Sequence, residues 1–167
     1  HLIAGVSYYK AGVPPRIELA DGPLDDATAE LLDQLYLHGL AEFAYRNGLD
    51  LRGRISFPRG GAAPAVGALA LPKRTLVPIG GGKDSLVAVE AIKSIGGEAT
   101  AVWVGNSALI AACAERTGLP TLNIQRELAP GLFELNRLGA WNGHIPVTAV
   151  NSAILAVAAI LYGYDSI

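Results

Sequence analysis

From Thr75 onward, short apolar segments alternate with stretches of helical periodicity, and this alternation constrains the fold more than any other feature of the sequence. The apolar segments at residues 76–79 and 99–104 have the length and composition of buried strands, and a third strand is predicted at residues 121–124. Helices are predicted over residues 85–95 and from a cap at Ser107 through Thr117. Strands separated by helices pair in parallel through right-handed crossovers. The sequence therefore predicts an α/β fold, with a Rossmann-like parallel sheet and helices on both faces.

The last part of the chain is predicted to add a helix and the start of a fourth strand. Residues 147–162 form the most hydrophobic helical stretch, and Pro146 stands where proline is favoured at the beginning of a helix. Residues 165–167 look like the first half of a strand. Because the chain also begins with His1 and not with Met, we expect it to be a piece of a longer protein whose sheet continues.

Residues 1–72 differ from the rest of the chain in their sequence pattern. They are predicted to form a small α+β region, a candidate for substrate binding, that precedes a domain at residues 73–167. Strands are expected at 3–9 and 54–57, on either side of a helix that Asp25 or Asp26 caps and Asn47-Gly48 ends. The apolar positions of that helix are Leu31, Leu32, Leu35 and Phe43. Residues 60–72, which are rich in proline and small residues, are the expected linker.

Composition excludes several classes of protein. Of the 167 residues 51% are hydrophobic and the net charge is −2, which excludes a disordered chain and provides no strong field for nucleic acid or an anionic membrane. The longest apolar stretch, residues 149–161, is interrupted by Asn151 and Ser152 and is too short to span a bilayer. A single cysteine, Cys113, is expected in the core and favours a cytoplasmic location. The sequence leaves the oligomeric state open.

A run of glycines joins the first predicted strand to its helix. Gly80, Gly81 and Gly82 let the backbone turn tightly, and the helix that follows directs its positive end at the same place. This arrangement is typical of a phosphate site. The spacing excludes a P-loop of the Walker type, since Asp84 separates Lys83 from Ser85. It also excludes the dinucleotide-binding pattern of three spaced glycines, because a serine stands at the third position.

The loop instead resembles the Ser-Gly-Gly-x-Asp-Ser signature of the PP-loop ATP pyrophosphatases, with Gly80 in place of the first serine. That resemblance implies ATP and Mg²⁺ as ligands, with Asp84 helping to hold the metal. Gly80 and Lys83 are further candidates for contact with the phosphates. A helix-capping role for Asp84 and a solvated Lys83 remain open alternatives. Gly105 and Asn106 follow the second strand at the edge where open α/β sheets bind ligands, so they are candidates for nucleotide contact.

A second group of polar residues precedes the last helix. The segment 141–148 reads Trp-Asn-Gly-His-Ile-Pro-Val-Thr and delivers an amide, an imidazole and a hydroxyl to a helix N-terminus. His144 can act as a general acid or base near neutral pH, although a histidine in a turn is often a structural donor. Asn142 accompanies it, and Trp141 is expected to pack.

These segments together resemble the UDP-N-acetylmuramoyl-L-alanyl-L-glutamate epimerases, the MurL family. The resemblance rests on residues 1–10, 38–49, 80–85 and 141–148 and covers nearly the whole chain. It implies ATP-dependent inversion of the terminal L-glutamate of UDP-MurNAc-L-Ala-L-Glu in peptidoglycan synthesis, through a carboxyl adenylate, with release of AMP and pyrophosphate. The alternatives are another adenylating PP-loop enzyme, tRNA-modifying or amide-forming, or a module that binds ATP or AMP without turning it over.

The resemblance also implies roles for individual residues. Pyrophosphate and Mg²⁺ are expected at Gly81, Gly82, Asp84 and Ser85. His144 and Asn142 are expected near the activated carboxylate, with His144 proposed as a proton carrier on chemical grounds. The cations that are candidates for the UDP-sugar end of the substrate are Lys10, Arg46 and Arg52.

Overall fold

The computed structural model describes residues His1–Ile167. The chain forms two compact units. The helical unit comprises His1–Gly67 and Leu128–Val150, and the sheet unit comprises Ala68–Glu127 and Asn151–Ile167. The segment 128–150 therefore packs with the N-terminal residues, whereas the sequence grouped it with 73–167. None of the helices combines the length and the apolar character that crossing a membrane requires.

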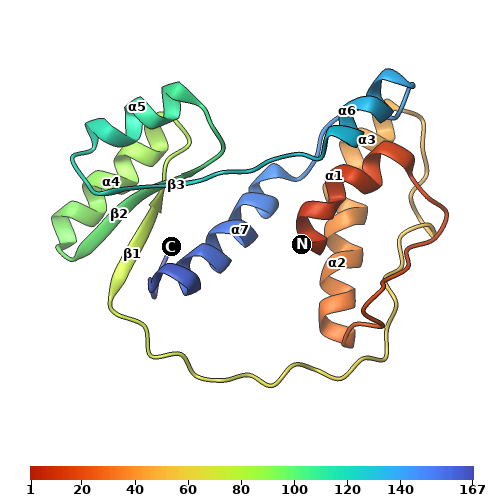
Figure 1. Ribbon diagram of the computed structural model, residues 1–167, viewed down its shortest axis with the longest axis horizontal. Helices are drawn as coiled ribbons and strands as arrows, with labels where there is room; N and C mark the ends of the chain where they lie inside the picture. Colours follow the sequence, from red (N-terminus) through yellow and green to blue (C-terminus); the bar gives the residue numbers. More distant parts are fainter. The chain divides into compact units, whose positions relative to one another are not determined.

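The sheet unit contains the three parallel strands that the sequence predicts. The strands are β1 (Arg74–Pro78), β2 (Glu98–Val104) and β3 (Thr121–Ile124), in the order β1-β2-β3 (Figure 1). Leu76 lies opposite Thr100, and Val102 lies opposite Leu122. The connecting helices are α4 (Lys83–Ile95) and α5 (Ala108–Arg116). Ser107 caps α5 by accepting a hydrogen bond from the backbone N–H of Ile110, as expected.

Helices cover both faces of this sheet (Figure 1). Alternate residues of a strand point to opposite faces, so each face has its own cluster of buried side chains. On one face a cluster joins the strands to α4 and α5 through Val77, Ile79, Val89, Ala99, Ala101 and Ala114. On the other face α7 (Val147–Tyr162) packs through Leu76, Val102, Leu155, Ala159 and Tyr164. Cys113 packs against the first cluster, in agreement with the expectation that it is a core residue.

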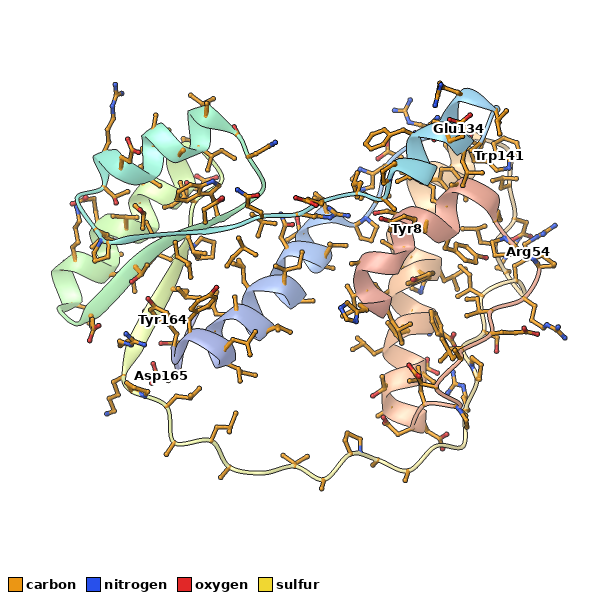
Figure 2. The ribbon with its side chains drawn as sticks, viewed as in Figure 1. Tyr8, Arg54, Glu134, Trp141, Tyr164 and Asp165 are labelled. Carbon is orange, nitrogen blue, oxygen red and sulfur yellow. The ribbon has the colours of Figure 1, made fainter.

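The predicted fourth strand is present only as a short parallel bridge. Ser166 pairs with Thr75, and its carbonyl accepts a hydrogen bond of 2.9 Å from the backbone of Leu76. Ile79 donates instead to Val102 of β2, so the bridge lies along the opposite edge of β1. Tyr164 and Asp165 lie beside β1 (Figure 2), and the Arg74 guanidinium stands 4.5 Å from the centre of the Tyr164 ring.

The helical unit corrects the predicted α+β region, because it contains no strand. Its helices are α1 (Leu2–Gly12), α2 (Asp26–Gly39), α3 (Ala41–Arg46) and α6 (Pro130–Arg137). Residues 3–9 are helical and not extended, since burial at Val6, Tyr9 and Val13 follows a spacing of three and four. Residues 54–57 form neither helix nor strand, and an isolated bridge joins Leu24 to Arg59. Helix α6 was not anticipated.

The helix predicted from Asp25 to Asn47 is interrupted at Leu40. Asp25 caps α2 as expected, by accepting a hydrogen bond of 3.0 Å from the backbone of Thr28. At Gly39, a Cβ atom would lie 2.7 Å from the ring of Pro146, so the close contact requires glycine. The chain turns at the fully buried Leu40 before α3 begins. Of the expected apolar positions, Leu32 and Phe43 are buried, but Leu31 is 59% exposed because it lies on the outer side of α2.

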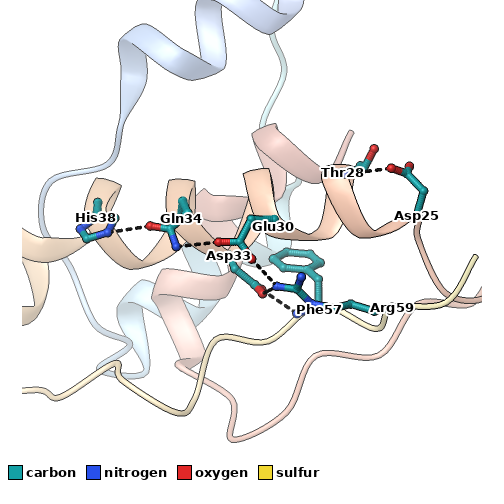
Figure 3. A network of polar contacts seen from close by, with 8 residues as sticks. All are labelled: Asp25, Thr28, Glu30, Asp33, Gln34, His38, Phe57 and Arg59. Carbon is teal, nitrogen blue, oxygen red and sulfur yellow. Dashed lines mark hydrogen bonds and ion pairs between the residues drawn. The ribbon is translucent and has the colours of Figure 1, made fainter. Parts of the chain in front are cut away.

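An aromatic core and a polar clamp hold residues 57–59 against α2. The rings of Tyr9, Tyr36 and Phe57 pack edge to face at centroid distances of 5.4 and 5.0 Å. Asp33 accepts a hydrogen bond of 2.7 Å from the backbone N–H of Phe57 and one of 2.6 Å from Arg59 (Figure 3). Arg59 also donates to Glu30. Residues 60–72, which follow this clamp, form neither helix nor strand.

We expect Asp33→Ala to destabilise the helical unit by about 1–3 kcal/mol, because the part-buried N–H of Phe57 would lose its acceptor. Urea unfolding monitored by far-UV circular dichroism measures this change. Glu30→Ala is the matched control, since it also removes a carboxylate from Arg59 but one that is exposed. A Glu30 variant that loses as much stability as the Asp33 variant would contradict the assignment.

Candidate functional site

The glycine loop lies at the carboxyl edge of the parallel sheet. Residues 79–82 leave the end of β1 and lead into α4, and Gly105 and Asn106 leave the end of the neighbouring strand β2. The carbonyl of Gly105 accepts a hydrogen bond of 2.7 Å from the side chain of Asn123 on β3. Parallel strands end at the same edge, so the residues predicted to contact nucleotide are gathered there.

Glycine is required by the backbone at Gly81. Its φ of +82° belongs to the left-handed region, and an added Cβ atom would meet the Ile110 side chain at 3.4 Å. Gly82 precedes α4 in an extended conformation, and no side chain caps the helix. The N–H groups of the first turn of α4 therefore have no side-chain acceptor, which suits an anionic ligand. Gly80 has no positive φ, and a Cβ atom there would meet nothing within 4 Å.

The polar residues of the loop are used unequally. The Ser85 hydroxyl donates a hydrogen bond of 2.8 Å to the carbonyl of Gly82 and so holds the turn. Lys83 and Asp84 are exposed and make no hydrogen bond or ion pair. The capping alternative for Asp84 is thus not observed, because α4 has no side-chain cap.

The donor set of the loop fits Mg²⁺ bound together with phosphate. This ion is commonly held by one or two carboxylates, with phosphate oxygens and waters completing the coordination. Asp84 offers one free carboxylate, and no cluster of three or more His, Cys, Asp or Glu side chains provides an all-protein metal site. A Mg²⁺ ion at Asp84 would therefore depend on the nucleotide for further ligands.

The Asn142-Gly143-His144 segment, called the NGH turn below, is docked on α1 and α3. Just before it, the N–H of Trp141 donates to the carbonyl of Ala11 at 3.2 Å. The Asn47 side chain donates to the carbonyl of Asn142 at 3.2 Å. Gly143 has a φ of +151°, and an added Cβ atom would lie 3.0 Å from the ring of Phe43. Two segments about a hundred residues apart in sequence thus form one surface of the helical unit.

His144 has a carboxylate as its neighbour. Its Nδ1 atom lies 3.9 Å from Glu42 Oε2, and each side chain is about half exposed. The other oxygen of Glu42 accepts a hydrogen bond of 2.8 Å from Arg46 Nε. The pair places an imidazole and a carboxylate next to each other on the surface of the NGH turn. Glu42 was not among the site residues predicted from the sequence, although it lies within residues 38–49, one of the segments that carry the family resemblance.

The remaining residues of this segment have mainly structural contacts. The Asn142 side chain makes a long hydrogen bond of 3.4 Å to the carbonyl of Ala140. Trp141, expected to pack, is 42% exposed (Figure 2). At the start of α6, the Tyr8 hydroxyl accepts a hydrogen bond of 3.0 Å from the N–H of Ala129 (Figure 2). The NGH turn belongs to the helical unit and the glycine loop to the sheet unit.

The three candidate cations differ in their partners. Arg46 donates to Glu42, and Arg52 makes a two-pronged contact with Asp50. The contact with Arg52 lowers the pKa of Asp50 to about 2. Lys10 has no carboxylate partner, and its Nζ atom lies 3.5 Å from the carbonyl of Gly143. Burial lowers the pKa of the Lys10 ammonium below its ordinary value.

Comparison with known proteins gives one consistent result. A family model described as the MurL N-terminal domain matches residues 1–167. A protein of Xanthomonas oryzae pv. oryzae named UDP-N-acetyl-alpha-D-muramoyl-L-alanyl-L-glutamate epimerase is 63% identical over 100% of this chain and 37% of its own length. A protein of the same name from Salinispora tropica is 44% identical over 98% of this chain and 36% of its own length.

A Micromonospora protein of that name is likewise 44% identical, over 96% of this chain and 36% of its own length. The chain thus spans little more than a third of the length of the curated relatives it matches. No solved structure matches it significantly.

Proposed function

This chain belongs to the MurL family, and on that basis we propose that it is the N-terminal part of an enzyme that inverts the terminal L-glutamate of UDP-MurNAc-L-Ala-L-Glu for peptidoglycan synthesis. The identity of 63% to a protein named as that epimerase, extending over the whole chain, supports the substrate class. The substrate itself is a small molecule and needs neither a nucleic-acid surface nor a membrane-spanning helix.

ATP makes the inversion chemically accessible in this proposal. The α-proton beside an ionised carboxylate is very weakly acidic, because its removal would create a second negative charge next to the first. The carboxylate first attacks the α-phosphorus of ATP, so that an acyl–AMP bond forms and pyrophosphate leaves. The neutral carbonyl then accepts the electron pair released when the α-proton is removed. Reprotonation on the opposite face and hydrolysis give D-glutamate and AMP.

The observation that carries this proposal is the glycine loop at the carboxyl end of β1, followed by a helix without a side-chain cap. Such a loop presents backbone N–H groups and the positive end of α4 to the departing pyrophosphate, whose growing charge they stabilise. These features favour a PP-loop nucleotide site of the doubly wound type. Mg²⁺ would neutralise phosphate charge there, and Asp84 is the side chain that would hold it.

The NGH turn is proposed to act on the α-carbon. His144 is the group that would carry a proton, and the Glu42 carboxylate lies 3.9 Å from its Nδ1 atom. Asn142 supplies an amide beside it. The two steps of the reaction, adenylation and proton transfer, would thus be carried by different segments of the chain.

Gly80→Ser is expected to raise the affinity for ATP by about three- to tenfold, because the hydroxyl that the PP-loop signature carries would add one hydrogen bond. The fold tolerates this change, since a Cβ atom at Gly80 meets nothing within 4 Å and φ is not positive. Isothermal titration of ATP with Mg²⁺ into the full-length protein measures the effect. An unchanged melting temperature together with weaker ATP binding would count against the PP-loop assignment.

The function is tested with the full-length protein, ATP, Mg²⁺ and UDP-MurNAc-L-Ala-L-Glu in D₂O. The proposal requires AMP, pyrophosphate and D-glutamate with deuterium at the α-carbon. AMP and pyrophosphate without deuterium would retain the adenylating loop but reject epimerisation, in favour of another adenylating enzyme. Binding of ATP without any product would favour a nucleotide-binding module.

A further inference from the structure

The Lys10 side chain lies next to the NGH turn. It lies in the last turn of α1, and its Nζ atom is 3.5 Å from the carbonyl of Gly143, the residue before His144. Trp141 anchors the same stretch to α1 through the carbonyl of Ala11. The ammonium is therefore held beside the residues proposed to act on the α-carbon of the substrate.

The charge of Lys10 is not balanced by the protein. Arg46 and Arg52, the other two candidate cations, are each paired with a carboxylate. Lys10 is part-buried and makes no ion pair, and its single contact is to a carbonyl at the limit of hydrogen-bonding distance. An ammonium has three N–H donors, so most of its hydrogen-bonding capacity remains available to an external anion.

Partial burial of Lys10 is unfavourable for its charged form. Burial disfavours the charged form and lowers the pKa of Lys10 in the folded protein, so the unfolded chain holds that proton more tightly. At neutral pH the charged Lys10 therefore lowers the free energy of unfolding. This destabilisation diminishes as the pH rises toward the ordinary lysine pKa. A bound carboxylate would offset that destabilisation.

We propose that Lys10 binds the side-chain carboxylate of the terminal glutamate of the substrate. This assignment rests on the proposed function. In that reaction the α-carboxylate loses its charge when it is adenylated, whereas the side-chain carboxylate remains anionic from substrate to product. A permanent cation beside His144 suits the group that stays charged, and contact with it would distinguish glutamate from glutamine. Arg46 and Arg52 are not assigned this role, because each is paired with a carboxylate of the protein.

The test compares binding of UDP-MurNAc-L-Ala-L-Glu with binding of the analogue that ends in L-Gln, in the full-length wild-type protein and in Lys10→Met. Methionine keeps the apolar stem and removes the charge. We expect the wild type to prefer the glutamate substrate, and Lys10→Met to lose about 10- to 100-fold in affinity for it while binding the glutamine analogue about as before. Lys93→Met, which removes an exposed lysine of α4 that pairs with Glu90, is the control and should keep the preference.

Stability supplies a second readout. A lysine that binds substrate and costs stability predicts a melting temperature for free Lys10→Met that is unchanged or higher. A Lys10→Met protein that retains the full preference for glutamate, or one whose melting temperature falls while both affinities drop together, would overturn the proposal. A wild type that shows no preference would overturn it too. A wild type that binds the substrate and discriminates but does not epimerise it would reject the proposed function alone.

Discussion

If the proposed adenylation is right, Gly81→Ala in the full-length protein is expected to lower the rate of ATP-dependent AMP formation by about 100-fold or more. The alanine must adopt the left-handed backbone conformation at φ +82°, which costs about 1–2 kcal/mol, or else the loop must rearrange. Its Cβ atom would also contact the Ile110 side chain at 3.4 Å, but the backbone conformation is the main source of strain. Either response shifts the backbone N–H groups that the proposal directs at pyrophosphate. Single-turnover measurement of AMP and pyrophosphate reads this effect.

The matched control is Gly118→Ala. Gly118 also has a positive φ, of +71°, but it lies between α5 and β3, and a Cβ atom there meets nothing within 4 Å. Its replacement carries the same kind of backbone strain without touching the loop, so stability should fall while AMP formation per folded molecule is retained. Equal losses of activity in the two variants would show that strain in the sheet unit, and not the loop, accounts for the effect.

His144→Gln is expected to lower α-proton exchange by about 10²- to 10⁴-fold, the contribution of a positioned acid or base, while AMP formation continues. Glutamine approximates the size of the ring but cannot take up a proton, and it keeps a polar atom near Glu42. The measurement is deuterium incorporation at the glutamate α-carbon, with AMP determined in the same samples.

His38→Gln is the control for that experiment. His38 is exposed on α2, and its Nε2 atom lies 2.8 Å from the Gln34 side chain (Figure 3). Its replacement should leave both readouts within about twofold of the wild type. If His144→Gln keeps normal exchange, or loses AMP formation in the same proportion as exchange, His144 is not the proton carrier.

The sheet unit could be predicted from the sequence because its determinants are local. Apolar runs such as residues 76–79 favour strands, glycines end helices, and Ser107 caps a helix, so each of these signals acts on the residues next to it. The glycine loop was found for the same reason, since the strand, the turn and the helix are contiguous. The structure confirms a parallel sheet with helices on both faces.

Within the helical unit, the sequence predicted α2 and α3 as one helix with its cap at Asp25 or Asp26, but not the helical state of residues 3–9 or the break at Leu40, whose determinants lie far apart in sequence. Tyr8 and Tyr9 have a high intrinsic preference for strands, yet packing against α2 makes the segment a helix. Beside the break at Leu40, Gly39 lies close to Pro146, which is more than a hundred residues away. Glu42 joins the candidate site only because the NGH turn docks on α3.

The most direct test of adenylation follows oxygen atoms. The α-carboxylate of the terminal glutamate in UDP-MurNAc-L-Ala-L-Glu is labelled with ¹⁸O. The full-length protein converts this substrate with ATP and Mg²⁺ in unlabelled water, and the AMP is analysed by mass spectrometry. When the carboxylate attacks the α-phosphorus and water later attacks the carbonyl, one labelled oxygen remains on phosphorus. The account predicts AMP that carries one ¹⁸O atom. Unlabelled AMP formed alongside D-glutamate would contradict it.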